Sequence, residues 1–219
     1  MKTTFSLLFV TAATFSGNAA IIPFASNATF IDNTQGNSIG NNVVIQKHPV
    51  WANPLPGSRW ISFADTGDPS SAAFGAPANG AVVSFFQHFT LSAADISAGG
   101  YISFFADDSA ASLLNGHLLV NEASISGNTY NACSDTKPNC IVATNLAIPS
   151  QDLVLGVNTL QFNVAQRAGS SFGLDYYGYV GAPSSLASTP EPATWSFVAG
   201  GALLMGIISR WRSTVGARS

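Results

Sequence analysis

Residues 158–164, Asn-Thr-Leu-Gln-Phe-Asn-Val, decide the fold class, because apolar and polar side chains alternate along them without a break. Leu160, Phe162 and Val164 fall on one face of this segment, and the polar residues between them fall on the other. Successive side chains point to opposite faces in an extended strand. The segment therefore predicts a β-strand with one buried face and one exposed face.

Several other segments read as strands by the same period of two. In residues 81–91 the apolar side chains share one face, although Gln87 interrupts that face and Phe86 interrupts the opposite one. No long stretch combines the helical period of 3.6 with good helix formers, so helices between the strands are not expected. The remaining candidate strands are residues 41–46, 59–63, 100–106 and 172–180.

The connections between these segments suit antiparallel sheets. Asn115-Gly116 lies between two apolar runs and is a strong hairpin signal, because both residue types tolerate positive φ. Gly99-Gly100 and Gly156 precede two of the predicted strands. We therefore expect an all-β fold, an antiparallel β-sandwich over residues 20–183.

Composition and charge exclude some functional classes. The chain has 219 residues, of which 47% are hydrophobic and only 9% are charged. Eight Lys and Arg residues face eleven Asp and Glu residues, which leaves no basic stripe for nucleic acid. Residues 20–189 carry four cationic residues against ten acidic ones, a net charge of −6. We expect no nucleic-acid partner and an acidic exported domain.

The first residues resemble a secretory signal peptide. Met1-Lys2 provides a positive start, an apolar run follows to Phe15, and small residues end the segment. Cleavage by signal peptidase after Ala19 fits the small-residue rule, and cleavage after Ala20 fits nearly as well. The sequence therefore predicts a signal peptide over residues 1–19 and an exported chain after it.

The other end of the chain predicts a membrane-spanning helix. Residues 193–209 contain no charge and would span about 25 Å as a helix, close to the thickness of a hydrocarbon core. Arg210 and Arg212 follow at once and place residues 213–219 in the cytoplasm by the positive-inside rule. Residues 184–189 read as a short linker in front of this region.

Residues 190–212 resemble the PEP-CTERM sorting signal. They contain the tripeptide Pro190-Glu191-Pro192, then the apolar helix, then the arginines. The resemblance implies that an exosortase cleaves near the tripeptide while the helix lies in the inner membrane of a Gram-negative bacterium. It also implies delivery to the cell envelope, the outer surface or the extracellular matrix. It does not identify what the delivered domain does.

The order of motifs in the exported domain resembles a jelly-roll. An apolar strand, an Asn-Gly turn and the segment Leu153-Val-Leu-Gly-Val-Asn-Thr-Leu160 follow one another as in galactose-binding-like modules. The stretch around Asp107-Asp108 is similar to PA14-type lectins. Both resemblances imply a jelly-roll sandwich that binds carbohydrate.

Cys133 and Cys140 are the two cysteines of the chain and are separated by a turn-rich segment. In an exported protein this spacing predicts a local disulfide. A redox site would favour Cys-x-x-Cys, and a metal site would need more ligands.

Asp107 and Asp108 are adjacent carboxylates at the end of a predicted strand, and they repel each other unless they are solvated or neutralised. Two interpretations remain open. In PA14-type lectins such a pair holds calcium, and Asn115 could add an oxygen ligand here. Alternatively, the pair lies in a solvated turn at the strand end, where Asp108 or Ser109 caps backbone amides. No cofactor other than calcium is implied.

Aromatic side chains could form a platform for sugar rings. Trp51, with His48, lies in a proline-rich segment that we expect to be a loop, and Tyr130 is a further candidate. The alternative is that such rings pack on sheet faces, as is usual for large aromatic residues. Trp60, Tyr176, Tyr177 and Tyr179 raise the same two possibilities.

No motif for an enzyme is present: the sequence contains no Gly-x-Ser-x-Gly, phosphate loop or dinucleotide fingerprint. We therefore expect a non-catalytic protein that binds extracellular polysaccharide. The alternative is a structural surface or biofilm-matrix protein with no small ligand.

Overall fold

The computed structural model describes residues 20–27, 31–34, 39–96, 98–123, 133, 136–167 and 170–181. All of these belong to the first of two compact units, Met1–Ser184. The predicted signal peptide, linker, sorting signal, membrane helix and cytoplasmic tail lie outside the described residues, as does Tyr130. Within the described ranges, no helix is long and apolar enough to cross a membrane.

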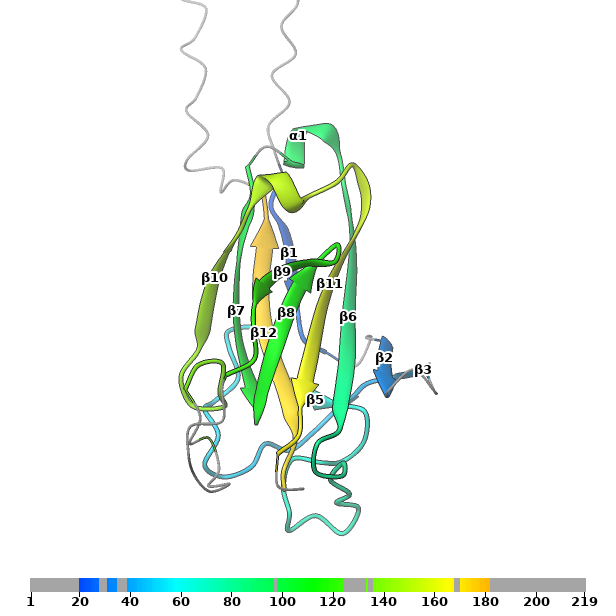
Figure 1. The fold of residues 1–219 in the computed structure, drawn as a ribbon, viewed down its shortest axis with the longest axis vertical. Coiled ribbons are helices and arrows are strands. Elements are labelled where there is room, and N and C mark those ends of the chain that lie inside the picture. Colours follow the sequence, from blue (N-terminus) through cyan, green and yellow to red (C-terminus); the bar gives the residue numbers. More distant parts are fainter. Residues whose placement is uncertain are drawn as a thin grey trace, which may run out of the picture. The chain divides into compact units, whose positions relative to one another are not determined.

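Two antiparallel sheets form the domain (Figure 1). The first sheet has the order β10 (Thr144–Ile148), β7 (Gly100–Asp107), β12 (Gly173–Val180), β5 (Ile61–Ser62) and β4 (Val43–Val44), and β1 (Ile22–Ala25) also pairs with β12. The second sheet has the order β3 (Ile39–Asn41), β2 (Ile31–Thr34), β6 (Val82–Leu91), β11 (Gly156–Ala165), β8 (Ser109–Leu114) and β9 (His117–Val120). The predicted all-β antiparallel sandwich is confirmed.

Most of the long strands alternate between the two sheets along the chain. The strands β6, β7 and β8 lie in alternate sheets, and so do β10, β11 and β12. The helical elements among the described residues are the single turns α1 (Ala93–Ile96) and η1 (Ser150–Asp152). Each connection between the faces is therefore a loop, which brings distant parts of the sequence together on each sheet.

Strand β11, which contains the alternating residues 158–164, lies inside the second sheet, between β6 and β8. Leu160, Phe162 and Val164 of β11 are at most 1% exposed, whereas the polar residues between them are half-buried on the outer face. The Asn115-Gly116 hairpin is also confirmed: these residues join β8 to β9 with φ values of 51° and 84°, as a two-residue hairpin turn requires.

Gln87, which interrupts the apolar pattern of β6, is half-buried on the side of the strand that faces the core. Its amide oxygen lies 3.5 Å from the hydroxyl of Tyr176, a fully buried residue of the opposite sheet. Gln87 therefore supplies a hydrogen-bond acceptor to the buried hydroxyl of Tyr176, and a buried tyrosine hydroxyl usually has such a partner.

Two apolar clusters hold the structure together. The larger lies between the sheets and includes Phe162 stacked on Tyr176, with ring centroids 4.8 Å apart. The smaller consists of Ile45, Trp51, Trp60, Phe105, Cys133 and Cys140. Phe105 alternates along β7 with the core residue Phe104, so this second cluster lies on the outer face of the first sheet. The outer face is thus partly covered.

Candidate functional site

The covered part of the outer face is built by the segment of residues 45–60. The rings of Trp51 and Trp60 lie 4.3 Å apart, and Trp60 stacks on Phe105 of β7 with centroids 6.0 Å apart. Trp51 is 3% exposed and Trp60 is 1% exposed. This proline-containing segment therefore folds back onto the sheet as a lid of tryptophans.

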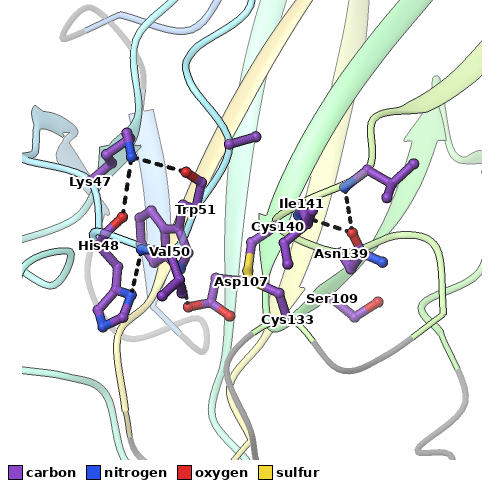
Figure 2. The surroundings of a disulfide bond; sticks show 12 residues. Lys47, His48, Val50, Trp51, Asp107, Ser109, Cys133, Asn139, Cys140 and Ile141 are labelled. Atoms are coloured by element: carbon purple, nitrogen blue, oxygen red, sulfur yellow. Dashed lines mark hydrogen bonds between the residues drawn. A yellow bond between two sulfur atoms is a disulfide. The ribbon is translucent and has the colours of Figure 1, made fainter.

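Asp107 lies beneath this tryptophan lid. The indole Nε1–H of Trp51 donates to Asp107 Oδ2 at 2.8 Å, and the carboxyl group is almost wholly buried. Figure 2 shows the two side chains pointing toward one another beside Cys133 and Cys140. A buried hydrogen bond to a carboxylate is stronger than a neutral one, so this contact fixes the lid on the end of β7.

Cys133 and Cys140 form the predicted disulfide, with their Cα atoms 5.2 Å apart. The backbone carbonyl of Cys140 accepts a hydrogen bond from the amide of Ala52 at 2.9 Å, which ties the disulfide loop to the lid. A carboxylate oxygen of Asp107 and the two sulfur atoms all lie within 4.8 Å of one another. Because both sulfurs belong to the disulfide, this group offers no thiolate to a metal.

Asp108, the second predicted calcium ligand, contacts a different segment from Asp107. Its Oδ2 accepts a hydrogen bond from the backbone amide of Arg167 at 2.6 Å, and its own amide donates to the carbonyl of Ala165 at 3.3 Å. The neighbouring Asp107 instead holds Trp51. The two carboxylates therefore serve as acceptors for separate parts of the fold.

Asn115, the third predicted calcium ligand, lies at the opposite end of β8 from the aspartates. Its amide donates to Asp152 O and Asn158 Oδ1 at 2.8 Å each, and its Oδ1 accepts the amide of Thr159 at 2.9 Å. The structure does not bring Asn115 to the Asp107-Asp108 pair. Asp108 caps a backbone amide as the second interpretation expects, but neither carboxylate is solvated, because both are buried.

The predicted sugar platform of Trp51, His48 and Tyr130 needs a correction. Trp51 is buried against Trp60 and so has no free ring face. His48 is half-buried, and its Nδ1 accepts the amide of Val50 at 3.3 Å. Tyr130 lies outside the described residues. Trp51 therefore has a packing role.

The open part of the same face carries three tyrosines. Tyr101 of β7 lies directly opposite Tyr179 of β12, and Ser103 lies opposite Tyr177. All three tyrosines are half-buried, and the rings of Tyr101 and Tyr179 are 6.1 Å apart. Tyr176, the remaining tyrosine of β12, points into the core instead. Because side chains alternate along β12, Tyr177 and Tyr179 lie on the outer face and Tyr176 lies in the core.

Asn145 of β10 extends this surface with polar groups. Its Oδ1 accepts hydrogen bonds from the hydroxyls of Tyr101 and Ser103, each at 2.8 Å. This arrangement leaves the exposed amide nitrogen of Asn145 without a protein partner among the described residues. We call Tyr101, Ser103, Asn145, Tyr177 and Tyr179 the tyrosine face.

The tyrosine face combines ring surfaces with oriented polar groups. The Asn145 amide offers two N–H donors, and the hydroxyl of Tyr101 keeps lone pairs as acceptors after donating to Asn145 Oδ1. Ser103 is 5% exposed, so its hydroxyl mainly orients Asn145 from below. None of its five residues is charged. Such a surface can stack on an apolar ring face and bind hydroxyl groups at its edge.

Asp175 lies two residues before Tyr177 on the same side of β12, but it is fully buried. Its Oδ1 accepts the hydroxyl of Ser26 at 2.9 Å, and its Oδ2 accepts the amide of Leu55 at 2.8 Å. Burial raises the pKa of the Asp175 carboxyl, although hydrogen bonds from Ser58, Leu55 and Ser26 oppose the effect. Asp175 therefore joins the first sheet to the lid.

We expect Asp175 to make the fold less stable as the pH rises from about 4, the ordinary aspartate pKa, through its raised folded pKa. In this window the folded state holds a proton that the unfolded state has lost. Asp175→Asn should remove this decline, so its stability relative to the wild type should increase between pH 4 and 7 in urea titrations. Asp68→Asn is the control, because the Ser70 amide and hydroxyl lower the pKa of Asp68. A pH-independent difference for Asp175→Asn would contradict the prediction.

No family model and no curated protein matches this sequence. Among solved structures, a family 35 carbohydrate-binding module from Clostridium thermocellum is 12% identical with a TM-score of 0.37, over 74% of this chain and 99% of that one. A family 2 glycosyl hydrolase from Bacteroides cellulosilyticus is 12% identical with a TM-score of 0.41, over 72% of this chain and 20% of that one. The β-glucuronidase of Bifidobacterium dentium is 17% identical with a TM-score of 0.37, over 68% of this chain and 21% of that one.

The chain spans only 16% of the length of the β-mannosidase of Dictyoglomus thermophilum and 21% of the Bifidobacterium enzyme. These likenesses are too distant to indicate what the chain binds.

Proposed function

We propose that this chain is a non-catalytic carbohydrate-binding protein of jelly-roll type, and that the tyrosine face is its binding surface. The observation that carries the proposal is the pairing of Tyr101 with Tyr179 beside the Asn145 amide. Tyrosine rings expose an apolar face to the C–H groups of a sugar ring, while the amide and hydroxyls can bind its hydroxyl groups.

The chemistry of the face favours an uncharged saccharide. A uronate or a sulfated sugar would call for a cationic partner, ideally a bidentate arginine. The tyrosine face has none, and the exported part of the sequence is acidic overall. We propose a neutral extracellular polysaccharide as the ligand.

The same surface supports a non-catalytic role. The acidic side chains of β7 and β12, Asp107 and Asp175, are both buried and accept hydrogen bonds from protein donors. Glycoside hydrolysis generally requires two carboxyl groups that face each other across the substrate. The five residues of the tyrosine face offer no carboxyl group at all.

Removing one ring should weaken binding measurably. We expect Tyr179→Ala to lower the affinity for a neutral polysaccharide about fivefold, because a stacked ring contributes on the order of 1 kcal/mol. The measurement is retardation in native gels cast with neutral or anionic polysaccharides. Tyr179→Phe keeps the ring and should retain most of the retardation.

Phe86→Ala is the matched control, because Phe86 is a half-buried aromatic residue of β6 in the second sheet. It should leave the retardation unchanged. Unchanged retardation of Tyr179→Ala would contradict the assignment of the face. If no neutral polysaccharide retards the wild type, the alternative of a structural matrix protein is favoured.

The delivery route is a second part of the proposal and rests on sequence. We propose export through the signal peptide, followed by exosortase cleavage near Pro190 and release to the cell envelope or matrix. The disulfide is of a kind that persists in oxidising compartments, which supports export. The intact mass of the exported protein reports whether the chain is cut near Pro190, and an uncut carboxyl terminus would contradict this route.

A further inference from the structure

The backbone nitrogen of Ala20 lies against a buried carboxylate. Its N–H donates to Asp95 Oδ1 at 3.1 Å, across 75 positions of the sequence. Asp95 is only 6% exposed. This contact joins the residue next to the predicted signal-peptide junction to the turn that follows β6.

Asp95 is held in place by the start of α1. Its Oδ2 accepts hydrogen bonds from the Ser92 hydroxyl at 2.6 Å and from the Ser92 amide at 2.9 Å. These bonds, the hydroxyl first, lower the pKa of Asp95, so the carboxylate is ionised at neutral pH. One oxygen thus belongs to a capping arrangement, and the other is directed at Ala20.

Ala20 is also packed into the fold on its carbonyl side. A Cβ atom at Gly181, whose φ is +102°, would lie 2.0 Å from the carbonyl oxygen of Ala20. The next residues enter β1, where Ile22 pairs with Val180. Ala20 is exposed as a residue, but its backbone contacts the domain on both sides, through its carbonyl at Gly181 and its N–H at Asp95.

We infer that the exported chain begins at Ala20 and that Asp95 binds the α-ammonium group created by processing. Hydrolysis of the Ala19–Ala20 bond adds water, gives Ala19 a carboxylate and leaves Ala20 with an amine that takes up a proton at neutral pH. The hydrogen bond is already charge-assisted by the ionised Asp95 carboxylate, and the positive charge on the donor turns it into an ion pair.

The inference rests on the predicted signal peptide and is independent of carbohydrate binding. It separates two cleavage positions that the small-residue pattern left nearly equal. A cut after Ala20 would remove the residue that packs on Gly181 and would place the amine on Ile21, one residue away from the position that contacts Asp95.

The first test is the mass of the exported protein. The full chain is expressed in a Gram-negative host, purified from the envelope fraction in mild detergent and measured intact. The result expected is an amino terminus at Ala20. An amino terminus at any other residue overturns the inference.

The second test asks whether Asp95 recognises the charge. A glycine inserted between Ala19 and Ala20 moves the amine by one residue and should lower Tm by about 3 °C. In Asp95→Asn the same insertion should have little effect, because the carboxylate is gone. The wild type, the insertion, Asp95→Asn and the combined variant form a double-mutant cycle. The cycle measures the interaction between the amine and Asp95 separately from the loss of the Ser92 contacts.

Asp68→Asn is the matched control, because Asp68 Oδ1 similarly accepts the amide and hydroxyl of Ser70, at 2.9 and 2.8 Å. The insertion should keep its full effect in that variant. Equal effects of the insertion with and without Asp95 overturn the inference.

A third measurement does not depend on the folding of Asp95→Asn. Acetic anhydride at pH 7 should acetylate the Ala20 amine about tenfold more slowly than the inserted glycine, because an ion pair keeps the amine protonated. Mass spectrometry of the amino-terminal peptide follows the reaction. Equal rates overturn the inference.

Discussion

Replacing Trp51 by alanine is expected to lower the free energy of unfolding by about 3–5 kcal/mol, the usual loss when a buried tryptophan is truncated. The ring is 3% exposed and packs on Trp60, and its Nε1–H is a donor to the buried carboxylate of Asp107. The variant loses both contacts at once. Urea unfolding followed by tryptophan fluorescence and circular dichroism measures the change.

Trp51→Phe separates the two contributions. It keeps an aromatic ring in the lid but removes the indole donor, so the expected loss is smaller, about 1–3 kcal/mol. Polysaccharide retardation of the folded Trp51→Phe chain should equal that of the wild type. A stable Trp51 variant that no longer binds polysaccharide would instead restore Trp51 as the sugar platform and contradict the tyrosine face.

Removing the disulfide should be the next most damaging change after truncation of Trp51. The bond between Cys133 and Cys140 closes a loop with a sequence separation of 7. The loop-entropy relation gives about 2.5 kcal/mol for a loop of this size. We expect the double change Cys133→Ala and Cys140→Ala to lose that much, measured as the free energy of unfolding in urea.

Thiol titration provides the control for this prediction. Both cysteines are buried, so the native wild type should show no reactive thiol, and the denatured chain should show thiols only after reduction. Two thiols that react in the native protein without a reductant would contradict the disulfide. Unchanged stability of the double variant would contradict its structural role.

The parts of the fold that the sequence predicted are those with a strong local period. The alternation in residues 158–164 and the Asn115-Gly116 turn depend on near neighbours only, and both were confirmed. Strand β10, Thr144–Ile148, was not predicted. It has only five residues, and its exposed positions are Asn145 and Ala147. So short an alternation does not stand out from a loop.

The candidate site was harder to predict, because strand pairing creates it. Tyr177 and Tyr179 could be recognised as two residues on one face, but their strand pairs with the strand of Tyr101 across more than seventy positions. Asn145 comes from the strand that the sequence pattern did not reveal. No local signal joins these three segments.

The position of Trp51 and the partners of the two aspartates depend on the same segment. Proline-rich composition predicts a loop, but it does not say whether the loop leaves the surface or folds back onto it. Here residues 45–60 return to the sheet, and their indole supplies the donor that Asp107 needs. Adjacent carboxylates can therefore be stabilised by separate protein donors as well as by a cation.

The pairing of β1 with β12 also determines when the domain can fold. Ile22, near the start of the described chain, pairs with Val180, near its end, and β12 lies between β7 and β5 in the first sheet. A chain that crosses a membrane amino terminus first cannot complete this sheet until residues 173–180 have emerged. Such long-range pairing slows folding. If the chain is exported as proposed, the order of the strands keeps the first sheet incomplete during translocation and allows it to close only once nearly the whole domain has crossed.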